Sequence, residues 1–125
     1  MAIPTLQLSD YVAPGEACHL ARVALHPGRR PALHTHDFFE LFWVDYGQVR
    51  HLTDEGSRED LLSTGALVFV RPHDVHGLQA HRGRAGLINI AFGREPLDAA
   101  YARHADRLGA QTFWSGEPNP ATLSL

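Results

Sequence analysis

Two histidines and a glutamate stand at even spacing and could together bind a metal ion. They are His34, His36 and Glu40. Because alternate side chains of a β-strand lie on one face, all three point the same way if no bulge intervenes. Imidazole nitrogen and carboxylate oxygen suit a divalent ion such as zinc, iron, manganese or nickel, and they leave positions for water or substrate. A fourth ligand has to come from another strand.

The same three side chains have two other interpretations. The chain contains 9 histidines in 125 residues, so a His-x-His pair alone carries little information. The side chains could form a polar cluster that binds an effector without a metal. They could also be structural residues whose hydrogen bonds are satisfied inside the fold. We expect the metal site and keep both alternatives open.

Five further residues are candidates for contact with a small ligand. Arg50 and Arg71 offer forked donors to a carboxylate or to sugar hydroxyls, and surface ion pairing is their alternative role. His73 could contact a ligand, or it could be an exposed loop residue. Trp43 could stack on a sugar or pack in the core. Asn89, inside an apolar strand, is either a ligand contact or a satisfied polar group.

Turn signals at short intervals indicate an all-β domain. Glycine and proline recur between β-favouring runs, for example at Pro27-Gly28, Gly47 and Gly65. Several runs are almost continuously apolar, as expected for strands that are covered on both faces. The pattern predicts a sandwich or barrel with strands at residues 6–8, 19–26, 38–45, 49–53, 66–71, 77–81 and 86–92.

One helix is predicted after the strands, over about residues 95–109. Pro96 lies near its start, and side chains recur at helical spacing at Leu97, Tyr101, His104 and Leu108. We expect this stripe to pack against the strands, with a subunit interface as the alternative. The tail, residues 110–125, lacks periodicity and is predicted to be a strap or a linker.

Length and composition predict a single globular domain over residues 1–125, with 44% hydrophobic and 20% charged residues. The longest apolar run, Ala66–Val70, is far shorter than the roughly 20 residues of a membrane helix. A secretory signal is not recognisable, and Cys18 is the single cysteine, so we expect a cytoplasmic protein without membrane contact. The 11 arginines are scattered among 14 acids, so direct nucleic-acid binding is not expected.

The spacing resembles the first motif of the cupin family. That motif combines a glycine, a His-x-His pair, a glutamate and a second glycine, which match Gly28, His34, His36, Glu40 and Gly47. The resemblance implies a cupin-type double-stranded β-helix, a jelly-roll barrel over about residues 4–92, with one C-terminal α-helix.

The stretch from Gly65 to His76, eleven residues later, resembles the second cupin motif. Its middle departs from the family, because Arg71-Pro72-His73 stands where Pro-x-Gly is usual and Ala80 stands where asparagine is usual. The resemblance implies that His76 completes the metal ligands. His73 and Asp74 lie beside it in the sequence and could orient it. Histidines outside both motifs are expected not to affect metal binding, namely His19, His26, His51, His81 and His104.

A closer resemblance is to the N-terminal sensor domain of AraC-type transcription regulators. It is carried by residues 34–41, 71–76 and 87–92, and it covers about residues 19–108. The resemblance implies a small-molecule effector, often a sugar or a sugar derivative, and a homodimer. In that family a helix-turn-helix module would follow the barrel, and we expect this chain to act without its own DNA-binding module.

The alternative function is a free-standing metal-dependent cupin enzyme, a dioxygenase, isomerase or lyase. Its support is the complete spacing of the four ligands. No residue stands out as a general base beside them, although His73 and Tyr46 are possible. The long resemblance to the sensor domains favours sensing over catalysis.

Overall fold

Antiparallel pairing of strands that are distant in the sequence builds this domain. The computed structural model describes residues 3–28, 31–108 and 121–124. The strands are β1 (Thr5–Leu6), β2 (Cys18–Leu25), β3 (Thr35–His36), β4 (Phe39–Tyr46), β5 (Gln48–Thr53), β6 (Arg58–Ser63), β7 (Ala66–Val70), β8 (Gly77–Ala80), β9 (Ala85–Phe92) and β10 (Ala121–Ser124). The helices are the short 3-10 turns η1 (Leu8–Asp10) and η2 (Asp54–Gly56), and α1 (Arg94–Leu108).

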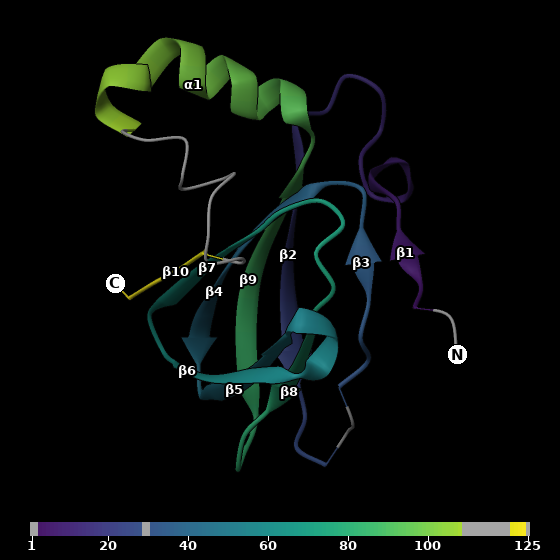
Figure 1. The fold of residues 1–125 in the computed structure, drawn as a ribbon, viewed down its shortest axis with the longest axis vertical. Coiled ribbons are helices and arrows are strands. Elements are labelled where there is room, and N and C mark those ends of the chain that lie inside the picture. The colour runs from purple at the N-terminus through teal and green to yellow at the C-terminus, as the bar shows by residue number, and fades with distance from the viewer. Residues whose placement is uncertain (1–2, 29–30, 109–120, 125) are drawn as a thin grey trace.

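The strands form two antiparallel sheets and one short parallel pair. The larger sheet has the order β10-β7-β4-β9-β2, the smaller has the order β6-β5-β8, and β1 pairs in parallel with β3. In Figure 1, α1 lies above the sheets, and β1 and β3 stand along one side. The predicted all-β class with one C-terminal helix is confirmed.

The core lies between the two sheets and is built by alternating residues. On β4, Phe42 and Val44 are 0% and 1% exposed, and they pack with Val68 of β7 and Leu87 of β9. Burial of each such side chain stabilises the fold by roughly 1.5–3 kcal/mol. Glu40 occupies the next inward position of β4, so the same alternation places a carboxylate at the end of the apolar core.

The helix covers one end of the outer face of the larger sheet. Leu97 of α1 packs on Phe39 and Phe69, and the Arg94 guanidinium lies 5.7 Å from the centre of the Phe39 ring. These contacts support the predicted packing role at Leu97. The side chains of the other members of the predicted stripe, Tyr101, His104 and Leu108, lie outside the described part of the structure.

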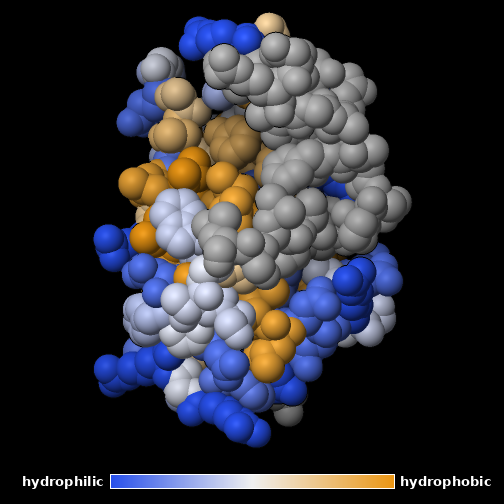
Figure 2. Space-filling view, turned by 90° about the vertical axis from the view of Figure 1, so that its left-hand side faces the viewer, coloured by the Kyte–Doolittle hydropathy of each residue, from blue (hydrophilic) through white to orange (hydrophobic). Residues whose placement is uncertain are grey.

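One side of the molecule carries hydrophobic residues at its centre, with hydrophilic residues at its upper and lower ends (Figure 2). Outward residues of the larger sheet, including Trp43 of β4 and Ile88 of β9, are half-buried. Within residues 3–28, 31–108 and 121–124, no helix has both the length and the apolar character needed to cross a membrane.

Three strands are absent from the predicted ranges, namely β3, β6 and β10, and one observed strand differs from its predicted range. The sequence pattern did not indicate β6, because Arg58, Glu59 and Asp60 begin it; charged residues are common at the edge of a sheet, where β6 lies. Within the predicted tail, β10 pairs with β7, while residues 109–120 and 125 lie outside the described residues. The strand expected at residues 6–8 ends at Leu6, where the chain turns into η1.

Gly47 permits the tight turn between β4 and β5, and its replacement by alanine is expected to destabilise the fold. Its φ is +78°, and an added Cβ would meet the Arg84 carbonyl oxygen and lie 2.8 Å from Cα of Ala85. Strain and overpacking together lower the free energy of unfolding by about 3 kcal/mol. Gly28→Ala is the matched control, since its φ is +87° with nothing within 4 Å. Equal losses for the two variants in urea denaturation would contradict the steric argument.

Candidate metal centre

His36 and Glu40 reach the same interior although the strand between them is broken. β3 ends at His36, the chain bends at residues 37–38, and β4 begins at Phe39. Asp37 anchors the bend, because its Oδ1 accepts a hydrogen bond of 2.8 Å from the Leu8 amide. The interruption is two residues long, so the even parity predicted from the sequence survives it.

His76 is brought to these residues by backbone pairing across the domain. His34 and His76 form an isolated antiparallel bridge, with a hydrogen bond of 2.9 Å in each direction between their amide and carbonyl groups. The amide of His73 also donates to the carbonyl of His36 at 2.8 Å. These bonds hold the loop before β8 against β3, so residues far apart in the sequence become neighbours.

Three buried side chains converge with ligand atoms that all lie within 4.8 Å of one another. They are His36, Glu40 and His76, and they are 1%, 5% and 0% exposed. Glu40 Oε1 lies 3.3 Å from His36 Nε2 and 3.2 Å from His76 Nε2. None of these three atoms has a hydrogen-bond partner. Buried polar atoms without partners are costly, and a shared cation would satisfy all three at once.

The tautomer of His36 suits metal binding. Its Nδ1 lies 2.6 Å from the carbonyl oxygen of Phe38, and its ring stacks on the Phe38 ring with centroids 4.4 Å apart. A carbonyl can only accept, so Nδ1 carries the proton and donates it. In the neutral ring, Nε2 therefore presents a lone pair towards Glu40, and the hydrogen bond and the stacking hold the ring in place.

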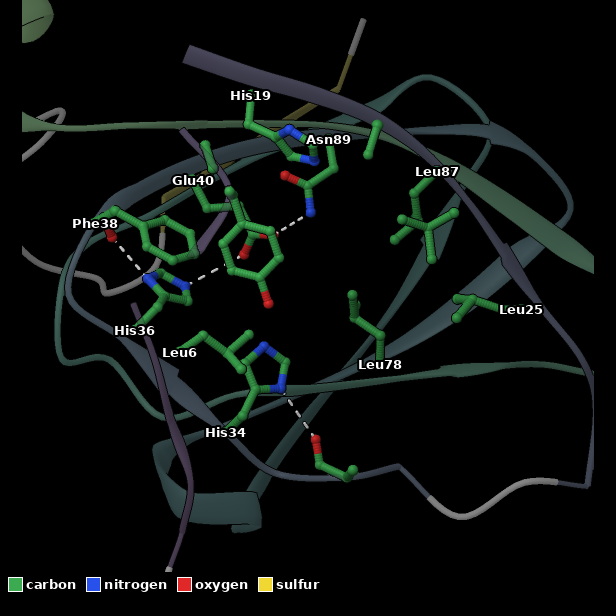
Figure 3. A pocket seen from close by; sticks show the side chains of 15 residues that line it. Leu6, His19, Leu25, His34, His36, Phe38, Glu40, Leu78, Leu87 and Asn89 are labelled. Carbon is green, nitrogen blue, oxygen red and sulfur yellow. Dashed lines mark hydrogen bonds and ion pairs between the residues drawn. The ribbon is translucent and has the colours of Figure 1, made fainter. Parts of the chain in front are cut away.

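Asn89 holds the other oxygen of Glu40. The Nδ2 group of Asn89 donates a short hydrogen bond to Oε2 of the carboxylate (Figure 3). The other oxygen, Oε1, faces His36 and His76. Burial by itself raises the pKa of Glu40, but contact with the rings of His36 and His76 outweighs it and lowers the pKa well below the ordinary value. Glu40 is therefore an anion inside the domain.

His34 lies beside the three converging residues and is not one of them. Its ring is half-buried, 4.6 Å from the His76 ring between centroids, and its Nδ1 donates to the Ala32 carbonyl at 3.2 Å. This bond leaves Nε2 as the free nitrogen, and Figure 3 shows the ring at the wall of a cavity. Burial lowers the pKa of His34 from its ordinary value of 6.5.

His51 belongs to the centre although neither sequence motif contains it. Its Nε2 lies 2.9 Å from Nδ1 of His76, and its ring is 0% exposed and meets the Phe42 ring edge-on at 5.4 Å. Burial lowers the pKa of His51 to about 3, so the ring is neutral at pH 7. One sequence signal could have found it: His51 alternates with Val49 and Thr53 on the inward face of β5.

A cavity of about 350 Å³ opens beside the three converging residues. Its polar lining is His34, His36, Glu40, Asn89, His19 and Tyr11, and its apolar lining is Leu6, Ala21, Val23, Leu25, Ala32, Phe38, Leu78, Leu87 and Ala91. In Figure 3, His36 and Glu40 stand on one side of the cavity and Leu25, Leu78 and Leu87 on the other. The cavity is therefore polar at one end and apolar at the other.

Comparison of the sequence with models of known protein families identifies the family of the chain. The model of the AraC-like ligand-binding domain matches residues 14–122, most of the chain. The chain belongs to this family. The predicted resemblance to AraC-type sensor domains is thus confirmed, and membership makes the cavity of this AraC-like domain its candidate ligand site. Among proteins with curated descriptions, none matches the chain.

Solved structures agree with this assignment. ToxT from Vibrio cholerae superposes with a TM-score of 0.65 at 6% identity, over 88% of this AraC-like domain and 43% of ToxT. A cupin superfamily protein from Desulfitobacterium hafniense gives 0.56 at 16% identity, over 66% and 73% of the two chains. These two show the fold, and the predicted cupin barrel is confirmed.

A third similar structure is that of a metal-containing protein. The iron(II) form of HppE in complex with substrate has a TM-score of 0.56 at 26% identity, over 61% of this AraC-like domain and 46% of HppE. The chain therefore spans less than half the length of HppE and of ToxT.

Four of the five predicted ligand contacts of this AraC-like domain are not among the described residues that line the cavity. Arg50 pairs with Glu59 at 3.2 Å on the surface, and Arg71 lies 3.8 Å from Asp74. His73 is exposed in its loop, and Trp43 is at an outward position of β4 because the strand alternates around buried Phe42. Asn89 does line the cavity, and it is also satisfied by Glu40.

Proposed function

We propose that this AraC-like domain senses a small molecule in a cavity whose polar end holds a divalent metal ion. The observation that carries the proposal is the convergence of His36, Glu40 and His76 with three buried, unpartnered ligand atoms beside the cavity. A bound ion would supply a positive charge that can take up an oxygen donor of the effector.

Two histidines and one carboxylate with open positions form the ligand set that suits non-haem iron(II). The similarity to HppE, whose solved form contains iron(II), supports iron as the ion, and zinc, manganese and nickel remain compatible with the same donors. We propose His34 as a further donor, because its free Nε2 belongs to a ring at the wall of the cavity.

In this proposal the domain acts in transcription regulation in the cytoplasm and forms a homodimer. Binding of the effector shifts the dimer between two states, and a separate DNA-binding module reads that shift. A net charge of −3 with acids interspersed among the arginines does not suit DNA binding by the domain itself, which supports this division of roles.

Elemental analysis of protein purified without chelator tests the proposed metal. We expect about one divalent ion per chain, and we expect its removal by chelator to lower the thermal unfolding temperature, because an ion bound to the folded state stabilises it. Metal-free protein that also gains no stability from added iron(II), zinc, manganese or nickel would rule the metal out.

A second candidate function is metal-dependent catalysis. The iron-type ligand set and the similarity to HppE favour it. Oxygen consumption by the iron(II)-loaded domain, dependent on an added small molecule and leading to a changed product, would favour catalysis. Effector binding without turnover would favour sensing.

A further inference from the structure

The cavity changes polarity from one end to the other. His36 and Asn89 lie next to Glu40, whereas Leu25, Leu78 and Leu87 lie on the opposite side (Figure 3). Val23 pairs with Leu87 on the neighbouring strand and also lines the cavity. No arginine is found among the described residues that line it, and Glu40 is the one acid there. A ligand that fills the cavity must therefore have one polar end and an apolar remainder.

We propose that the effector is a compact monocarboxylic acid with an aromatic or branched aliphatic body, and that it is not a sugar. This inference rests on the proposed function, because it places the carboxylate at the metal end of the cavity. The apolar body would then lie against Leu25, Leu78 and Leu87, as their position across from His36 and Glu40 in Figure 3 requires.

Desolvation argues against a sugar. A sugar carries hydroxyl groups around its whole ring, and each group buried without a partner weakens binding. The leucines and Val23 at the far end offer no side-chain donor or acceptor. The residues expected to recognise sugar hydroxyls, Arg50 and Arg71, lie outside the cavity lining, as does the stacking candidate Trp43.

Charge balance favours one carboxylate on the ligand. A divalent ion held by two imidazole rings and one carboxylate would keep one net positive charge inside a mostly apolar cavity, because bound imidazole is neutral and bound carboxylate is deprotonated. A monoanionic head group neutralises that charge, while a neutral head group does not. Without the metal, Glu40 repels a carboxylate, so binding should require the ion.

Size limits the body of the ligand. The volume of about 350 Å³ is near the lower end of the range for ligand pockets, which begins at about 300 Å³. A single ring or a short branched chain fits this space.

The proposal is tested with defined probes on the metal-loaded chain. Benzoate, cyclohexanecarboxylate and 3-methylbutanoate represent the class, benzamide tests the charge, and arabinose tests the sugar. We expect at least one carboxylate to raise the unfolding temperature and to bind in calorimetry, and we expect arabinose to do neither. Arabinose binding, benzamide binding as tight as benzoate binding, or binding of none of the three carboxylates would overturn the proposal.

A pair of variants on β2 locates the binding site. Ala21 lines the cavity, whereas Ala24 is exposed on the opposite face of the same strand. Ala21→Leu fills part of the cavity and is expected to weaken carboxylate binding by at least about tenfold, while Ala24→Leu leaves it unchanged. Equal affinity in Ala21→Leu and the wild type would overturn the proposal.

The metal content of every sample is measured in parallel. Wild-type protein that binds no metal contradicts the proposed function. Arabinose binding to a metal-loaded chain contradicts only the proposed class of ligand.

Discussion

Replacing Glu40 by glutamine is expected to lower the affinity of the domain for divalent metal by more than about 100-fold. Loss of a residue that only orients a metal-binding side chain lowers metal affinity by about 10–100-fold. Glu40 is itself a metal-binding residue and carries the negative charge of the site, so a larger loss is expected. The substitution keeps the shape of the side chain. Asn89 can still donate to the amide oxygen, which turns the amide NH₂ group towards the two histidines and places a donor where a cation would sit.

Two experiments measure this loss of metal affinity: thermal unfolding with and without added metal, and direct titration with metal. Metal at 100 times its Kd adds about 2.7 kcal/mol to the free energy of unfolding of the wild type, which raises Tm by about 10 °C for a domain of this size. Glu40→Gln should show almost no such increase.

The matched control for this substitution is Glu59→Gln. Glu59 is 47% exposed and pairs with Arg50 on the surface at 3.2 Å, where an ion pair is worth at most about 1 kcal/mol. The control removes the same charge outside the site and should keep the wild-type response to metal. If Glu40→Gln bound metal as tightly as the control, the assignment of the site would be refuted.

The sequence predicts the centre of the site because its spacing is determined locally. His36 and Glu40 are four residues apart, and an interruption of two residues between β3 and β4 preserves their parity. His76 could be added only through the resemblance to a second motif. No local rule joins it to His36, since a backbone bridge between distant segments brings them together.

The sequence does not predict which side chains share the cavity. Arg50 and Arg71 have the chemistry of ligand contacts, yet the first lies in a surface ion pair and neither lines the cavity. The direction of each side chain depends on strand pairing, which the sequence pattern does not specify. β6 illustrates the same limit. Its first residues are charged and do not resemble a strand in the sequence, and only its pairing with β5 defines it as an edge strand.

His51 is the clearest case of a residue that the motifs miss. Its contact with His76 has a consequence for the protons of both rings. If Nε2 of His76 binds a metal, the proton of that ring must be on Nδ1, which then donates to Nε2 of His51. The proton of His51 is then on its own Nδ1, a buried atom without a hydrogen-bond partner.

Replacing His51 by leucine is therefore expected to weaken metal binding by about 10–100-fold. The substitution leaves Nδ1 of His76 without its acceptor and allows that ring to turn away from Glu40. His51→Gln should recover part of the affinity, because its amide oxygen can accept the same hydrogen bond. The exposed His26 supplies the matched control, and His26→Leu should bind metal as the wild type does. Wild-type affinity in His51→Leu would show that His51 only fills space.

A second measurement on the same variant tests whether the buried ring of His51 is neutral. The pKa of His51 is about 3 in the folded chain and about 6.5 when unfolded, so only the unfolded chain binds this proton between those values. The stability of the metal-free wild type should therefore fall as the pH drops below 6.5, by roughly 1.4 kcal/mol per pH unit. His51→Leu removes this contribution, so it should lose metal affinity at pH 7 yet resist acid better than the wild type in urea denaturation. Because burial of the ring causes this pH dependence, an equal loss of stability below pH 6.5 in His51→Leu and the wild type would contradict the lowered pKa.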